Sequence, residues 1–159
     1  MALDQTILQA AIRSQDLAEF WEVVLPIIAR EVRCHSLAVV RSDKGEWIVD
    51  ASTRPKTDLA ADLLAEGLDR GGIVTSGNAF VALIPQAGDL LLLGELESAP
   101  TPKVKARLEE LVMETSLART LVEERERDRS RIERLQAILD IAAQWNRTLK
   151  MEELLHTMA

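Results

Sequence analysis

AFVALIPQAGDLLLLGEL, residues 79–96, decides the class of fold, because it holds two unbroken apolar runs separated by a short turn sequence. Short apolar runs bounded by Pro and Gly are typical of β-strands, and residues 86–88 suit a hairpin connection between them. A strand that is apolar at every position is covered on both of its faces. We therefore expect these two segments to be central strands of a sheet.

Three further strands are expected before this pair. Residues 36–40 and 47–49 are short, apolar and rich in β-branched side chains. The segment between them carries Gly45, which suits the left-handed position of a hairpin turn. Residues 72–75 form another short candidate strand. The sheet is therefore expected to draw its strands from most of the first hundred residues.

Helical periodicity flanks these strands. Residues 1–32 carry apolar residues at three-to-four spacing, and the capping residues Ser14 and Asp16 divide the segment into two expected helices. Pro26 is expected to kink the second helix or to open a new turn. Residues 58–69 repeat leucine at helical spacing before two glycines, which predicts a third helix.

A long helix is expected after the strands, beginning at Pro102, which suits a first helical turn. No Gly or Pro occurs from there to about Arg147, a stretch far longer than an ordinary globular helix. This length favours a coiled coil, with an a/d seam that is apolar at both ends and charged in the middle. We expect a homodimer interface formed by Leu108, Leu111, Thr115, Ala118, Val122, Ile132, Leu139 and, near the seam, Trp145.

Two alternatives remain open for this helix. A charge-rich segment is also typical of a single solvated helix that folds back onto its own domain. Trp145 fits a dimer anchor and fits equally well the core of a further domain.

Composition limits the classes of function. Residues 1–100 contain 8 Lys and Arg against 15 Asp and Glu, which argues against direct nucleic-acid binding by this fragment. The single cysteine cannot form an internal disulfide. No apolar run approaches the length of a membrane span, and the N-terminal residues lack the features of a signal peptide. We expect a cytoplasmic protein without membrane contact.

The order of these elements, with the helix at 17–32 leading into the strand at Ser36 and a long exit helix at the end, resembles the GAF domain family. The resemblance implies an α/β fold of the α+β type. Its central antiparallel sheet of five or six strands would be flanked by helices and followed by a long C-terminal coiled-coil helix. In this family one face of the sheet carries a small-molecule pocket, and the first and last helices often build a dimer.

A second cue lies near the C-terminus. Asn146-Arg-Thr-Leu149 and Glu152-Glu-Leu-Leu155 resemble the helix break and helix start that open another GAF domain. Thr148 is then expected to cap a helix beginning near Met151. The expected division is a GAF-like domain over 1–101, a signalling helix over 102–146, and the start of a further, truncated GAF-like domain over 147–159.

The pocket that the resemblance implies would lie on the sheet beside the helix at 58–69. Its candidate residues supply an aromatic floor and polar anchors: Trp47, Ser52, Arg54, Thr75 and Phe80. The alternative is that Trp47 and Phe80 are core residues. The charged Asn-Lys-Phe-Asp-Glu signature of cyclic-nucleotide-binding members is absent, and the sequence identifies no cofactor.

No catalytic or metal site is expected. Cys34 and His35 are adjacent, but neighbours on a strand point to opposite faces and cannot work as nucleophile and base. His35 and His156 lie in separate expected units, and no further Cys or His is available to complete a metal site. A Gly-rich phosphate loop is also absent.

We therefore expect a regulatory, sensory and dimerisation module of a bacterial multidomain signalling protein, acting in signal transduction or transcription regulation. A small-molecule ligand or a partner would change the domain, and the helix would pass the change to an output domain. The alternative is a non-catalytic coiled-coil adaptor whose α/β head binds another protein without a small ligand. A third hypothesis, a small enzyme, lacks the acid–base pair that it would need.

Overall fold

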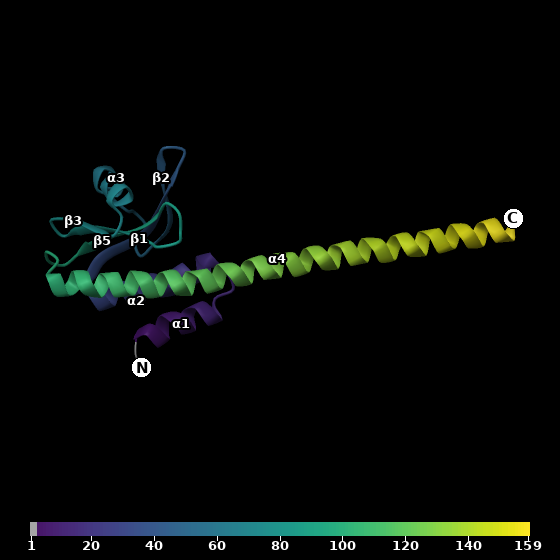
Figure 1. Cartoon of the computed structure of the whole chain (residues 1–159), viewed down its shortest axis with the longest axis horizontal. Coiled ribbons are helices and arrows are strands. Elements are labelled where there is room, and N and C mark those ends of the chain that lie inside the picture. The colour runs from purple at the N-terminus through teal and green to yellow at the C-terminus, as the bar shows by residue number, and fades with distance from the viewer. Residues whose placement is uncertain (1–2) are drawn as a thin grey trace. The chain divides into compact units, whose positions relative to one another are not determined.

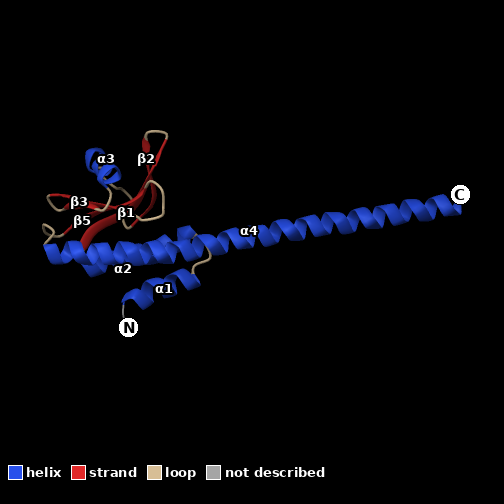
Figure 2. Cartoon of the chain, viewed as in Figure 1, coloured by secondary structure: helices blue, strands red, loops and turns tan. Residues whose placement is uncertain are grey.

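A computed structural model describes residues 3–159, with side chains described from Gln5 onward. The elements are α1 (Leu3–Arg13), α2 (Leu17–Val32), β1 (Cys34–Asp43), β2 (Glu46–Ser52), α3 (Ala61–Arg70), β3 (Ile73–Ser76), β4 (Ala79–Leu83), β5 (Leu90–Leu96) and α4 (Pro102–Met158) (Figures 1 and 2). Met1 and Ala2, the first residues of the expected N-terminal helix, lie outside the described residues. The chain divides into two compact units, residues 1–123 and 124–159, which are described separately.

The strands form one antiparallel sheet of five strands in the order β2-β1-β5-β4-β3, which confirms the predicted α/β class. β5 lies at the centre, and residues 90–94 are all buried, as an unbroken apolar run predicts. The β1–β2 hairpin turns at Lys44 and Gly45, both in the left-handed region with φ of 51° and 85°. A β-bulge between Val39 and Val40 shifts the register of this hairpin.

Both faces of the sheet are covered, because successive residues of a strand point to opposite sides. Leu37 and Leu92 belong to the larger apolar cluster, which also contains residues of α1, α2 and α4. Ala38 and Leu91 belong to a smaller cluster with α3. Figure 1 shows α3 on one side of the strands and α2 on the other.

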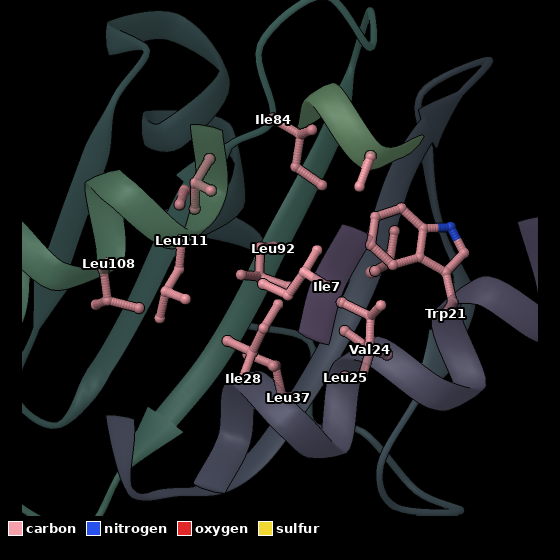
Figure 3. Packing of buried hydrophobic residues seen from close by; sticks show 14 of the residues in the cluster. Ile7, Trp21, Val24, Leu25, Ile28, Leu37, Ile84, Leu92, Leu108 and Leu111 are labelled. Atoms are coloured by element: carbon pink, nitrogen blue, oxygen red, sulfur yellow. The ribbon is translucent and has the colours of Figure 1, made fainter. Parts of the chain in front are cut away.

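The larger cluster joins α2 and the first part of α4 to the sheet. Figure 3 shows Ile28 of α2 and Leu111 of α4 gathered near Leu92 of β5. The buried stripe of α2 repeats at helical spacing and consists of Phe20, Trp21, Val24, Leu25, Ile28 and Val32. This stripe fixes α2 on the sheet, as its periodicity predicts.

Local capping sets where α2 begins. The Asp16 carboxylate accepts a hydrogen bond from the backbone N–H of Glu19 at 2.8 Å, and the Glu19 carboxylate accepts one from the backbone N–H of Gln15 at 2.7 Å. The helix then continues through Pro26, which lies on its exposed side. The segment after Pro26 is therefore part of one helix, and Arg33 ends it at a φ of 55°.

α4 begins with the Thr101 hydroxyl accepting a hydrogen bond from the backbone N–H of Val104 at 3.3 Å. The break expected at residues 146–149 is not formed, because α4 continues to Met158. Thr148 does not cap a new helix: its hydroxyl donates to the carbonyl oxygen of Gln144, one turn back, at 3.0 Å. That the last residues open a further GAF-like domain stays a prediction.

Within the described part of the chain, no helix combines the length and the apolar character that a membrane span requires.

Candidate functional site

The five residues expected to line a ligand pocket do not come together on one face of the sheet. Trp47 is half-buried against the cluster that α3 covers. Phe80 is fully buried in the larger cluster on the opposite face. Thr75 pairs directly with Phe80 across β3 and β4 and therefore points to the same side as Phe80.

Phe80 is a core residue, which is the alternative that the sequence left open. It pairs with Gly94 across β4 and β5. A Cβ built on Gly94 would lie 2.4 Å from Cε1 of the Phe80 ring and 2.9 Å from Leu37. The ring therefore lies directly over the backbone of β5, in the space that a side chain at position 94 would need.

Ser52 and Arg54 lie where β2 runs into the following loop. The Ser52 hydroxyl is 2.8 Å from the hydroxyl of Thr57 and accepts a hydrogen bond from the backbone N–H of Arg54 at 3.2 Å. Ser52 therefore organises the loop, and the Arg54 side chain is exposed. Ser52 therefore has a local structural role, and Arg54 takes part in it only through its backbone N–H.

α3 lies directly on the sheet, next to the place where the pocket was expected. Leu63 and Leu64 of α3 are buried against Val81 and Leu91 of the sheet. A Cβ built on Gly67 would lie 2.4 Å from Cγ1 of Val81, so the helix backbone lies directly on β4. This close approach fills the space between helix and sheet with their own side chains.

The first half of the expected dimer seam is buried inside the same domain. Its five members, each at most 3% exposed, are Leu108, Leu111, Thr115, Ala118 and Val122. The four apolar ones belong to the larger cluster on the sheet. These positions therefore face the protein's own interior and cannot face a second chain, which corrects the expectation for this half of the helix.

The second half of the expected seam is exposed. Ile132, Leu139 and Trp145 are 55%, 68% and 71% exposed. They share one helical face with Leu135 and Leu149, which the predicted seam missed. Ile132 and Leu139 repeat every seven residues, and Leu135 and Leu149 lie three residues after positions of that repeat. We call this face the distal stripe: Ile132, Leu135, Ile138, Leu139, Ala142, Trp145 and Leu149.

The distal stripe has the a, d and g pattern of a coiled-coil helix. Ile132 and Leu139 occupy a positions, Leu135 and Leu149 occupy d positions, and Ile138 occupies a g position. Moving the seven-residue series of Leu108, Thr115 and Val122 back by one residue leads to Leu135 and Leu149 and would have found this stripe in the sequence. The exposed Ile141 lies outside this face, at a c position.

A shorter exposed stripe lies on the part of α4 that belongs to the first unit. Met113, Leu117 and Leu121 follow each other at four-residue spacing and are 52%, 60% and 47% exposed. They alternate with the buried stripe, so α4 carries apolar side chains both toward its sheet and away from it. We call these three residues the proximal stripe.

An ion-pair bridge joins the end of α2 to the start of α4. Arg107 on α4 donates from Nε to Glu31 on α2 at 3.3 Å and from NH1 to Glu110 at 2.7 Å. The hydrogen bond to Glu110, followed by the one to Glu31, raises the pKa of the Arg107 guanidinium above its usual value. The bridge is solvent-exposed, so it orients the two helices more than it stabilises them.

The Cys34 side chain is not an activated nucleophile. Burial, together with the nearby charge of Glu97, raises the pKa of its thiol to about 12. The thiol therefore stays protonated at neutral pH. Among the described residues, no group of three His, Cys, Asp or Glu side chains has the geometry of a metal site.

Comparisons with known proteins give a fold and no sequence family. No protein-family model and no curated protein sequence matches the chain. Solved structures do match. The GAF domain of an Acinetobacter phosphoenolpyruvate-protein phosphotransferase aligns with a TM-score of 0.57 at 12% identity, over 74% of this chain and 90% of that chain.

Two other solved structures agree. The GAF domain of the potassium sensor histidine kinase KdpD from Escherichia coli aligns with a TM-score of 0.57 at 15% identity, covering 86% of this chain and 97% of that chain. PelD 158-CT from Pseudomonas aeruginosa aligns with a TM-score of 0.57 at 19% identity, over 79% of this chain and 50% of that chain. The chain therefore has a GAF-like fold, as the order of its elements predicts.

Proposed function

We propose that this GAF-like domain is a regulatory or sensory module of a bacterial multidomain signalling protein, and that its long helix transmits a change in the domain to an output domain. Support comes from the solved neighbours, one of which is a domain of a sensor histidine kinase. A GAF-like fold alone does not define an activity, so the functional argument depends on the residues of the helix.

The observation that carries this proposal is that α4 takes part in both compact units. Leu108, Leu111 and Val122 are core residues of the first unit. The same helix then carries the exposed distal stripe in residues 132–149. A rearrangement of the core on the α2 side of the sheet must therefore act on a helix whose remainder is available to a partner.

We propose a second copy of the same chain as the partner of the distal stripe. Apolar side chains at a and d positions fit a parallel coiled coil of identical helices, because each knob meets the matching hole of its copy. Asn146 falls at an a position within this pattern, and a polar residue there specifies register and oligomeric state. Transmission through this helix, and any role in transcription regulation, are proposals that depend on this dimer.

Light-scattering mass measurement tests the dimer. Leu139→Glu places a charge at the centre of the distal stripe and is expected to raise the dimer dissociation constant about tenfold or more. Ile141→Glu is the matched control, because Ile141 is also apolar and exposed but lies outside the stripe. A fragment of residues 1–123 removes the stripe altogether and is expected to be monomeric.

Two results would contradict this proposal. One is a full-length chain that is monomeric at about 100 µM, a concentration at which a biologically useful coiled coil associates. The other is equal weakening by Leu139→Glu and Ile141→Glu. A dimer that persists in the fragment 1–123 would instead assign the association to the proximal stripe.

The close packing of α3 favours a second candidate function. Because α3 lies directly on the sheet, the space between them is filled by Leu63, Leu64 and Val81. A head with no ligand pocket beneath α3 suits a non-catalytic coiled-coil adaptor that binds another protein. A melting temperature that no small molecule raises would favour the adaptor over the sensor.

A further inference from the structure

A cavity of about 400 Å³ lies on the α2 side of the domain, away from α3. It is lined by side chains from five elements or their ends, among them Trp21 of α2, Arg41 of β1, Asp50 of β2, Asp89 before β5 and Arg119 of α4. Its volume falls in the lower part of the range of small-ligand sites. We call it the Arg119 cavity.

Arg119 lies in the wall of this cavity and has one unused hydrogen-bond donor. Its side chain is only 13% exposed, and its NH1 pairs with Glu123 at 3.1 Å. The Nε atom is buried and has no hydrogen-bond acceptor among the described residues. A buried charged donor without an acceptor is costly, so a small rotation of the Arg119 side chain that turned it toward a ligand oxygen in the cavity would be favoured.

Among the other charged residues that line the cavity, Asp89 is the one without an ion pair in the described part of the chain. Arg41 and Asp50 satisfy each other through a hydrogen bond of 2.9 Å from Nε to Oδ1, and Arg41 also lies 3.7 Å from Asp43. Asp89 forms no ion pair with the basic side chains in the described part of the chain. The wall of the cavity therefore contains a guanidinium with one unused donor and a carboxylate without an ion pair.

We infer that the Arg119 cavity binds a small zwitterion of α-amino-acid size. The ligand carboxylate would accept from Arg119, the ligand ammonium would pair with Asp89, and its aliphatic part would lie against the buried Trp21. Opposite charges on ligand and cavity match at both ends, which is the arrangement that gives specificity. The inference rests on the proposed sensory function, since it names the ligand class that such a sensor would detect.

The position of the cavity suits regulation. Arg119 lies one helical turn before Glu123, the last residue of the first compact unit. A ligand held between α2, the sheet and Arg119 would therefore fix α4 just before the distal unit begins.

Thermal-shift and calorimetric titrations of the full chain test this inference. The probes are the individual proteinogenic L-amino acids at about 5 mM, which saturates any site with a dissociation constant below about 0.1 mM. At least one amino acid is expected to raise the melting temperature by about 3 °C or more. Its N-acetyl amide, which carries neither charge, is expected to have no effect.

Variants assign the binding to the cavity. Asp89→Asn and Arg119→Met are each expected to raise the dissociation constant about tenfold or more. Asp89 is exposed, so its substitution should leave the fold intact even if Arg119→Met does not. Glu123→Gln is the matched control, because it removes the ion pair of Arg119 and leaves the buried Nε in place; we expect it to retain binding.

Three results would overturn the inference: no amino acid binds, the N-acetyl amide binds equally well, or Asp89→Asn binds as tightly as the unmodified chain. Light scattering on the same samples separates this failure from that of the proposed function. A chain that dimerises through the distal stripe but binds no amino acid would overturn the ligand class alone.

Discussion

Gly67 allows the backbone of α3 to lie directly on the sheet. A Cβ there would lie 2.4 Å from Cγ1 of Val81, which is fully buried. We predict that Gly67→Ala lowers the free energy of unfolding by about 1–3 kcal/mol, because α3 must move away from β4. Urea denaturation measures the change.

The cause of that loss can be isolated with a double variant. Val81→Ala removes the methyl group that the new Cβ would meet. Val81→Ala should therefore lower the free energy of unfolding by at least about 0.5 kcal/mol less in the Gly67→Ala variant than in the unmodified chain. Purely additive effects would show that the contact between α3 and β4 is not responsible.

Thr115 carries a hydroxyl that the surrounding core does not use. The residue is 2% exposed, and its Oγ1 has no hydrogen-bond partner among the described residues. We predict that Thr115→Val raises the free energy of unfolding by about 1 kcal/mol, since it removes an unsatisfied buried polar group at nearly constant volume.

Thr120 provides the matched control for this substitution. Its hydroxyl donates to the carbonyl oxygen of Ser116 at 3.0 Å. Thr120→Val therefore loses a hydrogen bond and should leave stability unchanged or lower. Equal effects of the two substitutions in urea denaturation would show that β-branched packing, and not the unsatisfied hydroxyl, controls stability here.

Cys34 makes stability depend on pH in the alkaline range. Burial raises the pKa of its thiol from 9.0 to about 12, with a smaller contribution from Glu97. The unfolded chain therefore releases this proton at a lower pH than the folded chain does. The contribution of Cys34 to stability is fully present below pH 9 and is lost as the pH rises toward 12.

We predict that Cys34→Ala weakens this alkaline loss. The comparison is the free energy of unfolding from urea titrations of both proteins between neutral pH and about pH 10.5. The difference in the free energy of unfolding between the unmodified chain and Cys34→Ala should be constant below pH 9 and should change above it. Parallel curves over the whole range would contradict the assignment to Cys34.

At the scale of elements, the sequence predicts the strands well and the partners of the helices poorly. The unbroken apolar runs correctly locate β4 and β5, because only a strand covered on both faces is apolar at every position. A long helix beginning at Pro102 was also predictable from the absence of Gly and Pro, although the break expected at residues 146–149 is not formed.

The partner of α4 could not be predicted in the same way. A stripe that packs on a sheet and a coiled-coil seam repeat with almost the same period, 3.6 against 3.5 residues. Leu108 and Leu111 therefore fit a dimer seam in the sequence and lie on the sheet in the structure. Phe80 fits a pocket floor for a similar reason, because its role depends on Gly94 of another strand.

For the whole molecule, the core defines where the domain ends. Val122 is fully buried in the larger cluster, together with Leu108 and Leu111. We predict that a fragment of residues 1–123 unfolds cooperatively with a melting temperature close to that of the full chain. A fragment of residues 1–101, which ends at the boundary expected from the sequence, should fail to fold.

Circular dichroism during heating distinguishes the two fragments. The shorter one loses a helix that covers one face of the sheet, and this loss exposes apolar residues of β1 and β5 to water. A cooperative transition in the fragment 1–101 would show that the α2 side of the sheet is sufficient without α4. It would also support the domain boundary at residue 101.

The two outer strands of the sheet influence how the molecule behaves at high concentration. An exposed strand edge is a template on which further strands can grow into aggregates. β3 is only four residues long, and β2 carries Glu46 and Asp50 and pairs with a strand that contains a bulge. Short length, charge and the extra twist of a bulge each oppose edge-to-edge growth. The sheet is thereby protected from becoming a fibril seed.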